Sequence, residues 1–336
     1  MGLTNQLFTL SKGIHDAIDD RCNVVVIDRF LCDYSNHEYV RVSDVLDLEK
    51  MNVYFREKYG LVLVDRHGFD FELLSVTYGT VESKVDVTRT VKEKYYRDKK
   101  LFISRLTDLN DIQGDPFPGL RKHIWFEYRL NGDVIVDKYE EHLARDIDYT
   151  NDNYAMSPMG WPSKNHDTFE DILTHITYTK QLYDVSRKQL SGTALTSRVN
   201  LVHLRVEEDA INHWSRMNGM SKEDFRVELE NRYIQLVREN INESDTTIVL
   251  SSSSDNGVIG FLDENGYNYF ASRKSFQHRE LNAIVDFIIS KQCNNVFIGN
   301  FDFDGMNGSS FSYYVKVSLH SDVTYERVDL DHVLVH

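Results

Sequence analysis

VNLVHLRVEEDAINHW, residues 199–214, joins an apolar strand to an arginine and a run of acids. The apolar and β-branched residues from Val199 to Leu204 are typical of a strand buried in a parallel sheet. Arg205 follows directly and would lie at the carboxyl edge of that sheet. Because the chain carries a formal net charge of −15, a cation at this position indicates a local anion site and not a broad basic surface.

The second half of the chain alternates strand and helix patterns around this stretch. Strands are predicted at residues 200–206, 246–252, 268–272 and 295–300, and helices at 222–241, 279–292 and 309–319. This repeated order predicts an α/β fold with a doubly wound parallel sheet and ligand sites at the carboxyl ends of its strands.

The first half begins with the same alternation and then becomes irregular. Leu3, Leu7, Leu10, Ile14 and Ile18 follow helical spacing. Strands are predicted at 23–30 and 59–65, a hairpin at 124–139 around Asn131-Gly132, and one long helix at 167–190. Since 336 residues favour two domains, we place these at 1–190 and 191–336.

The overall composition limits the classes of partner. With 38 basic and 53 acidic residues, we expect no nucleic acid and no membrane as a partner. Cys22, Cys32 and Cys293 have neither metal-ligand spacing nor an even count, which favours a reducing compartment, with the cytoplasm as the expected location, or thiols without a role. No apolar run reaches the roughly 18 residues that span a bilayer.

Three loops are predicted to open at one edge of the second sheet: the one at Arg205, SSSSDNG at 251–257 and GNFDFDGMNGSSFS at 299–312. In the last, Ser309, Ser310 and Phe311 stand where a helix begins, and free backbone N–H groups there bind anions. Together with Arg205, these loops favour a diphosphate as the bound anion. The alternative is that Arg205 pairs with Glu207, Glu208 or Asp209 and that the serines only cap a helix.

Four segments carry a resemblance to a known family: GLTNQL at 2–7, HLR at 203–205, RELNAIVDFIISKQCNNVFIGN at 279–300 and GSSFS at 308–312. They resemble the inverting fucosyltransferase superfamily, in particular its protein O-fucosyltransferase-like branch. The resemblance implies a GT-B fold, in which two Rossmann-like doubly wound domains face a central cleft. It also implies a glycosyltransferase that moves L-fucose from GDP-fucose to a hydroxyl of a glycan or glycoprotein.

The resemblance also implies roles for single residues. Arg205 would hold the pyrophosphate of the donor, and the acceptor would bind the domain at 1–190. The further donor-binding residues would be Gly2, Asn5, His203, Ser252, Asp255, Asp286, Ser309, Ser310 and Phe311. The sequence departs from the family pattern in two places. The strand expected before GLTNQL is missing, and the loop after Asn300 carries the additional residues FDFDGMNG. Transfer of another sugar, such as rhamnose or xylose, is therefore an alternative.

Transfer with inversion requires groups that stabilise the negative charge on the leaving diphosphate and a base that accepts the proton of the acceptor hydroxyl. Arg205 and the helix-start amides would supply the first without a metal or other cofactor. Glu208, slightly favoured, and Asp209 are the candidate bases. The DFD triplet at 302–304 has the pattern of a cation ligand pair, but such triplets are frequent in acidic chains and we expect no metal there.

Two other functions fit the sequence less well. A catalytically inactive glycan-binding module would not need a pyrophosphate clamp, and a dinucleotide enzyme would need a GxGxxG motif after a strand, which is lacking. Trp161 is the tryptophan best placed to face a sugar, although most aromatic residues are core. The motif at Gly2 fits either an unusual start or a domain excised from a longer polypeptide, and the latter would allow fusion to other glycosyltransferase domains.

Overall fold

The computed structural model describes residues 3–27, 29–33, 38–143, 147–149, 166–251, 256–301 and 309–329. The fold is mixed α/β with parallel sheets. The chain groups into two compact units. The C-terminal unit comprises Met1–Leu7, Leu31–Tyr39 and Tyr178–His336, and the N-terminal unit comprises Phe8–Phe30 and Val40–Thr177.

The predicted parallel sheet forms the centre of the C-terminal unit, and Thr324–Arg327 adds a fifth strand that the sequence analysis does not predict. Its order is β14-β13-β12-β15-β16. The strands are β12 (Val199–His203), β13 (Thr246–Leu250), β14 (Tyr269–Ala271), β15 (Val296–Gly299) and β16 (Thr324–Arg327). Every residue of β12, β13 and β15 is buried, which explains why these strands are apolar on both faces.

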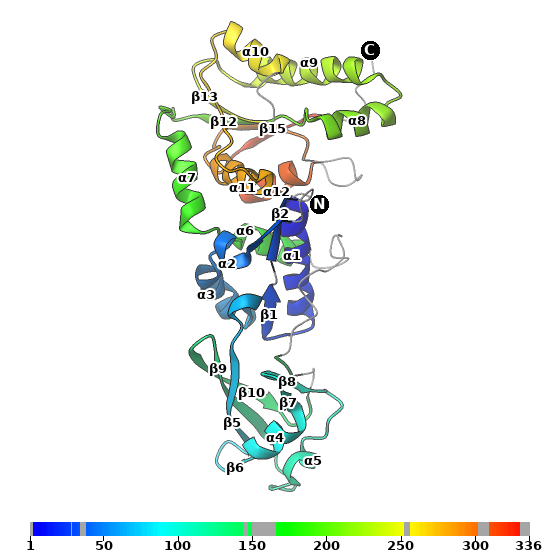
Figure 1. The fold of residues 1–336 in the computed structure, drawn as a ribbon, viewed down its shortest axis with the longest axis vertical. Coiled ribbons are helices and arrows are strands. Elements are labelled where there is room, and N and C mark those ends of the chain that lie inside the picture. Colours follow the sequence, from blue (N-terminus) through cyan, green and yellow to red (C-terminus); the bar gives the residue numbers. More distant parts are fainter. Residues whose placement is uncertain are drawn as a thin grey trace. The chain divides into compact units, whose positions relative to one another are not determined.

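Helices cover both faces of this sheet (Figure 1). They are α7 (Lys180–Leu190), α8 (Glu208–Met217), α9 (Lys222–Asn240), α10 (Gly257–Glu264), α11 (Arg279–Ser290) and α12 (Ser310–Ser318). In Figure 1, α8, α9 and α10 lie on one side of the strands, and α7, α11 and α12 on the other. Phe225, Leu229 and Tyr233 of α9 belong to the core that packs against Val202 and Ile298. The doubly wound arrangement is therefore confirmed for this unit.

The N-terminal unit contains a smaller parallel sheet. In it, β1 (Val24–Ile27) pairs with β4 (Val62–Asp65). The helices of this region are α1 (Leu3–Asp19), α2 (Val42–Val45), α3 (Leu48–Tyr59) and α6 (His166–His175). A further two-stranded sheet joins β2 (Arg29–Asp33) and β3 (Glu38–Arg41), whose residues 31–39 belong to the C-terminal unit.

The segment that follows β4 is antiparallel. One sheet has the order β10-β9-β5-β6 and another the order β11-β8-β7. The elements are β5 (Phe71–Gly79), β6 (Lys84–Asp86), α4 (Thr88–Tyr95), β7 (Tyr96–Arg97), β8 (Lys100–Ile103), α5 (Asn110–Gln113), β9 (His123–Leu130), β10 (Asp133–Glu140) and β11 (Ile147–Asp148). The predicted hairpin is β9–β10, and Asn131 and Gly132 take φ values of 53° and 96°, as the tight hairpin turn requires.

The single long helix predicted at 167–190 is wrong, because two helices separated by Ile176–Thr179 occupy this range. The Thr177 carbonyl accepts a hydrogen bond from the Asp47 N–H at 2.9 Å, outside any helix. Thr179 is extended, with ψ 153°, and precedes α7 as its N-cap residue. The longest segment of the C-terminal unit starts at Tyr178, whose hydroxyl contacts that of Tyr314, and α7 of this segment packs on α11.

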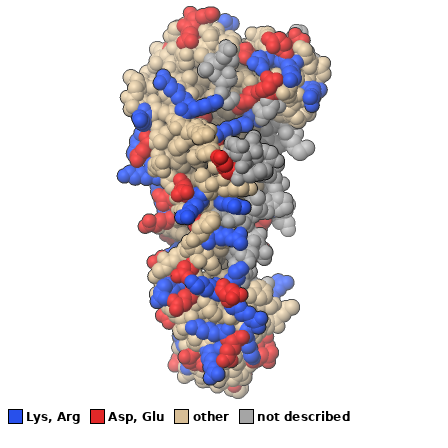
Figure 2. Space-filling view, viewed as in Figure 1, with Lys and Arg blue, Asp and Glu red and all other residues tan. Residues whose placement is uncertain are grey.

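Charged side chains of both signs are interspersed on the face drawn in Figure 2. This agrees with a chain in which acids outnumber bases without forming separate blocks. Within the described ranges, no helix combines the length and apolar character that crossing a bilayer requires.

Candidate functional site

The central strands β12 and β15 are neighbours, and the chain leaves them toward opposite sides of the sheet. In the strand order β14-β13-β12-β15-β16, the sheet continues from β12 toward one edge and from β15 toward the opposite edge. In open α/β sheets, ligands bind at the carboxyl ends of strands at this topological switch point. His203 and Arg205 leave β12 there, and Asn300 and Ser309 follow β15. The structure therefore brings two of the three predicted loops together.

A buried histidine links the two loops directly. The His203 Nδ1 atom lies 2.6 Å from the Ser312 Oγ atom in the first turn of α12, and the rings of His203 and Phe311 are 4.7 Å apart. Burial, with a smaller effect of the Arg205 charge, lowers the pKa of His203 to about 3. The imidazole is thus neutral at neutral pH and fixes the end of β12 against the start of α12.

Arg205 is held at the strand end by its backbone. Its N–H donates to the Tyr233 hydroxyl at 3.1 Å, and that hydroxyl donates to the His203 carbonyl at 2.9 Å. The guanidinium forms an ion pair with Glu207, with Nη1 and Oε2 3.1 Å apart. The predicted alternative of an acidic partner therefore holds for Glu207, while the charge also lies close enough to His203 to affect its pKa.

The start of α12 is built by Asn300, Ser309 and Gly299. The Ser309 N–H donates to the Asn300 carbonyl and to its Oδ1 atom, both at 2.9 Å. The Ser309 side chain caps the helix by accepting from the Ser312 N–H. A Cβ atom on Gly299 would lie 3.2 Å from the Ser312 Oγ atom and 2.9 Å from the Phe297 ring, so a glycine allows α12 to approach the strand.

Glu208 is not well placed to act as a base. Its carboxylate contacts Lys222 Nζ at 3.1 Å and Arg226 Nη2 at 2.9 Å, and it is largely exposed. The hydrogen bond from Lys222, its charge and that of Arg226 lower the pKa of Glu208. The sequence could not show these cations, because they come from α9. For Asp209, which follows Glu208 in α8, the side chain lies outside the described residues.

Asp286 and Asn5, which the resemblance assigns to binding of the nucleotide sugar, lie elsewhere in the fold. Asp286, on α11, is partly buried; burial raises its pKa to about 6, and a hydrogen bond with Ser272 opposes the rise. Ser272 follows β14 at the edge of the sheet, so Asp286 contacts a loop other than the two at the switch point. Asn5 is a half-buried residue of α1 and groups with the C-terminal unit.

Several predicted residues lie outside the described part of the chain. These are Gly2, Trp161, Ser252, Asp255, Gly308 and the DFD triplet at 302–304. The third predicted loop can therefore be followed only at Ser251 and from Asn256 onward.

Sequence reasoning missed the residues that hold the site together. Tyr233 gave no local signal, because its partners are some 30 residues distant and it lies within an ordinary amphipathic helix. Ser312 was part of the GSSFS motif, but only the fold shows that its hydroxyl meets His203.

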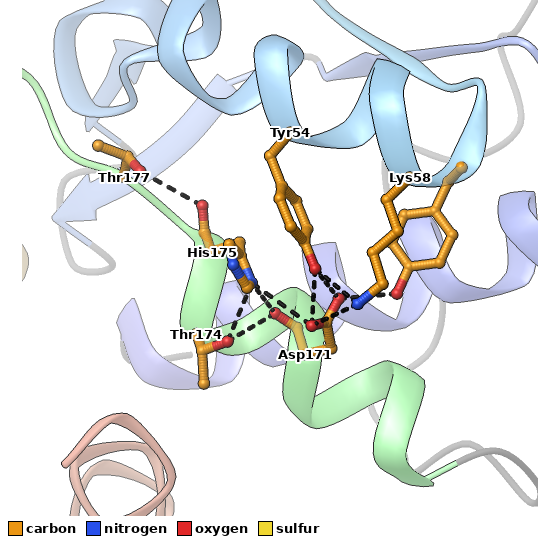
Figure 3. A network of polar contacts seen from close by, with 7 residues as sticks. Tyr54, Lys58, Asp171, Thr174, His175 and Thr177 are labelled. Carbon is orange, nitrogen blue, oxygen red and sulfur yellow. Dashed lines mark hydrogen bonds and ion pairs between the residues drawn. The ribbon is translucent and has the colours of Figure 1, made fainter. Parts of the chain in front are cut away.

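A second polar cluster belongs to the N-terminal unit and also escaped the sequence analysis (Figure 3). The Asp171 carboxylate of α6 accepts hydrogen bonds from Tyr54, Tyr59 and Lys58 of α3, at 2.6 to 2.8 Å. The Tyr54 ring stacks on His175 at 3.5 Å. Burial opposes ionisation of Asp171, but these hydrogen bonds outweigh it and lower its pKa. All its donors come from one neighbouring helix, which indicates that the cluster joins α3 to α6.

Comparison with known proteins gives structural similarities only. No protein-family model matches the sequence, and no curated protein matches it. A crystal structure of POFUT1 (protein O-fucosyltransferase 1) in the apo form is similar with a TM-score of 0.48 and 12% identity, over 96% of this chain and 93% of that chain. A POFUT1 complex with GDP-fucose has a TM-score of 0.48 and 11% identity over the same shares. Another GDP-fucose complex has a TM-score of 0.34 and 15% identity, over 52% of this chain and 53% of that chain. Since each TM-score is below 0.5, we base the proposed function on the residues and contacts of this chain.

Proposed function

We propose that the protein is an inverting glycosyltransferase that moves L-fucose from GDP-fucose to a hydroxyl of a glycan or glycoprotein. The observation that carries the proposal is the His203–Ser312 contact, which joins the strand end bearing Arg205 to the first turn of α12 at the switch point. The sequence resemblance of both segments to fucosyltransferases supports fucose and guanosine diphosphate as the donor groups. The proposal includes acceptor binding by the N-terminal unit.

The site has the two elements that a leaving diphosphate requires. The first N–H groups of a helix have no partner within that helix, and the helix dipole adds partial positive charge. Arg205 adds a fixed charge with planar donors that match phosphate oxygens. Glu207 would then serve as the counter-ion of Arg205 in the absence of donor and would orient the guanidinium when the pyrophosphate binds. The donor is held in this way without a metal or other cofactor.

The acceptor hydroxyl must lose a proton as it attacks the anomeric carbon. We propose Asp209 for this role over Glu208, because Lys222 and Arg226 lower the pKa of Glu208 and occupy its oxygens. His203 is buried and neutral, so it positions the loops and does not exchange protons with the acceptor. None of the three cysteines forms a disulfide, and a reducing, cytoplasmic location remains our expectation.

Nucleotide binding tests the proposal. We expect GDP and GDP-fucose to raise the melting temperature of the purified chain, and Arg205→Ala to remove this shift. Arg187→Ala is the matched control, because Arg187 is an exposed residue of α7 whose partner is Asp184. If no nucleotide or nucleotide sugar changes the melting temperature of the wild-type chain, the proposed function is wrong.

Turnover separates the transferase from its alternatives. We expect slow release of GDP from GDP-fucose without acceptor, and no increase in its rate when Mg²⁺ or Mn²⁺ is added. Faster release from GDP-rhamnose or from a xylose donor would assign another sugar to the same site. Tight glycan binding together with no turnover of any donor would indicate a glycan-binding module.

A further inference from the structure

Three potential metal ligands from distant parts of the sequence meet in the C-terminal unit. They are Cys32 of β2, Glu38 of β3 and His278, which precedes α11. One ligand atom from each residue lies within 4.8 Å of the other two. His278 Nδ1 is 3.2 Å from the Glu38 carboxylate, and the Cys32 thiol donates to the Glu38 carbonyl oxygen at 3.3 Å. Among the described residues, no other group of three meets the same geometric test.

The chemistry of this trio is specific. Thiolate, imidazole and carboxylate are the three ligand types that Zn²⁺ takes in proteins, at about 2.0 to 2.3 Å from the metal. A hard cation such as Mg²⁺ or Ca²⁺ prefers oxygen ligands only, so the sulfur and nitrogen atoms select against it. We propose that Cys32, Glu38 and His278 bind a zinc ion, with water as the fourth ligand.

The surroundings of the three side chains fit this assignment. Cys32 is buried, at 2% exposure, whereas the His278 and Glu38 side chains are 26% and 49% exposed. The sulfur is therefore shielded from solvent, and the open side lets the ion and its water enter. On binding, the Cys32 thiol releases a proton to solvent and its hydrogen bond to the Glu38 carbonyl is exchanged for the bond to zinc.

His278 is held in position before the metal arrives. The Asn282 side chain donates to the His278 carbonyl at 2.9 Å and to the Phe276 carbonyl at 2.8 Å, which fixes the turn before α11. The ion would join this turn to the β2–β3 segment. Residues 31–39 of that segment belong to the C-terminal unit, although most of this unit comes from residues 178–336. The ion would thus cross-link two segments of the unit, and this effect does not depend on the proposed transferase activity.

Cobalt substitution tests the ligand set. The full chain is stripped with EDTA under reducing conditions, without an affinity tag, and titrated with Co²⁺ alone. We expect one cobalt per chain and a sulfur-to-cobalt charge-transfer band in the near ultraviolet. Zn²⁺ should abolish the band by displacing the cobalt and should raise the melting temperature of the stripped protein.

Substitutions assign the band to the proposed residues. Cys32→Ser should remove the charge-transfer band, and His278→Gln and Glu38→Gln should each weaken Co²⁺ binding by about tenfold or more, since even an outer-shell change costs that much. Cys22→Ser and His67→Gln, which change another partly accessible thiol and an exposed histidine, should leave binding unchanged.

Clear outcomes would overturn the zinc site. One is a titration of the wild-type chain that gives no charge-transfer band; another is a band that survives in Cys32→Ser or disappears in Cys22→Ser. Because Cys32→Ser changes a buried residue, the partly exposed His278→Gln variant is the second test, and unaltered Co²⁺ affinity there would equally contradict the proposal. None of these results bears on nucleotide binding, which is measured separately with GDP.

Discussion

His203 shows how one buried residue shapes the candidate site. It is 8% exposed, its ring contacts Ser312 and Phe311, and the Arg205 charge lies nearby. A protonated imidazole there would be buried beside another cation. The residue is therefore suited to join two loops and unsuited to carry charge.

The low pKa of His203 makes folding stability depend on pH. The folded-state pKa of about 3 is below the ordinary value of 6.5, so the unfolded chain binds a proton first as the pH falls. The contribution of this residue to the free energy of unfolding is fully present above about pH 6.5. It is lost as the pH falls from there to about pH 3. Between pH 7 and pH 5 we expect a loss of about 2 kcal/mol.

Urea unfolding at the two pH values checks this expectation. His203→Gln should lower the free energy of unfolding at pH 7 but reduce its loss between pH 7 and pH 5 by about 2 kcal/mol relative to the wild type. His67→Gln, which changes an exposed histidine, should retain the wild-type pH dependence. An equal pH dependence in all three proteins would show that His203 titrates normally.

At the scale of elements, the first turn of α12 has two roles. Ser309 caps the helix, and the same turn presents its N–H groups at the switch point. Ser221 caps α9 in the same way, by accepting from the Asp224 N–H, but α9 begins at another position in the unit. The two serines therefore form a matched pair in which only one cap lies at the proposed diphosphate site.

Replacing each cap separates helix stability from nucleotide binding. Ser309→Ala and Ser221→Ala should each lower the free energy of unfolding by about 1 kcal/mol, because each leaves a helix-start N–H without its side-chain acceptor. Only Ser309→Ala should also reduce the melting-temperature shift caused by GDP. Equal GDP shifts in the two variants would place the nucleotide away from α12.

At the scale of the whole molecule, stability and proposed binding are distributed over two compact units. The Asp171 cluster belongs to the N-terminal unit, together with α3 and α6, whereas Arg205 and α12 belong to the C-terminal unit. Substitutions in the Asp171 cluster should therefore affect folding stability without removing the groups that we propose to bind the nucleotide sugar.

Asp171→Asn tests this separation. The change weakens the acceptor of hydrogen bonds from Tyr54, Tyr59 and Lys58, and we expect it to lower the free energy of unfolding by about 1 to 3 kcal/mol. The melting-temperature shift caused by GDP should be as large as in the wild type. Loss of that shift in a folded variant would show that the N-terminal unit also contributes to nucleotide binding.

The sequence by itself determined the elements whose signals are local. Helical spacing gave α1, the apolar run at 199–204 gave β12, and Asn131-Gly132 gave the β9–β10 hairpin, because each depends on neighbours along the chain. The strand and helix order of the second half was sufficient to predict its doubly wound sheet and the edge at which Arg205 and Ser309 emerge.

Only the tertiary structure decided which side chains meet. It joined His203 to Ser312, placed Lys222 and Arg226 on Glu208, and brought His278 to Cys32. It also ended α6 before Ile176, where the chain passes from one unit to the other. These outcomes depend on contacts between residues distant in sequence, and such contacts form only when helices and strands pack and exclude water. Local periodicity carries no information about them.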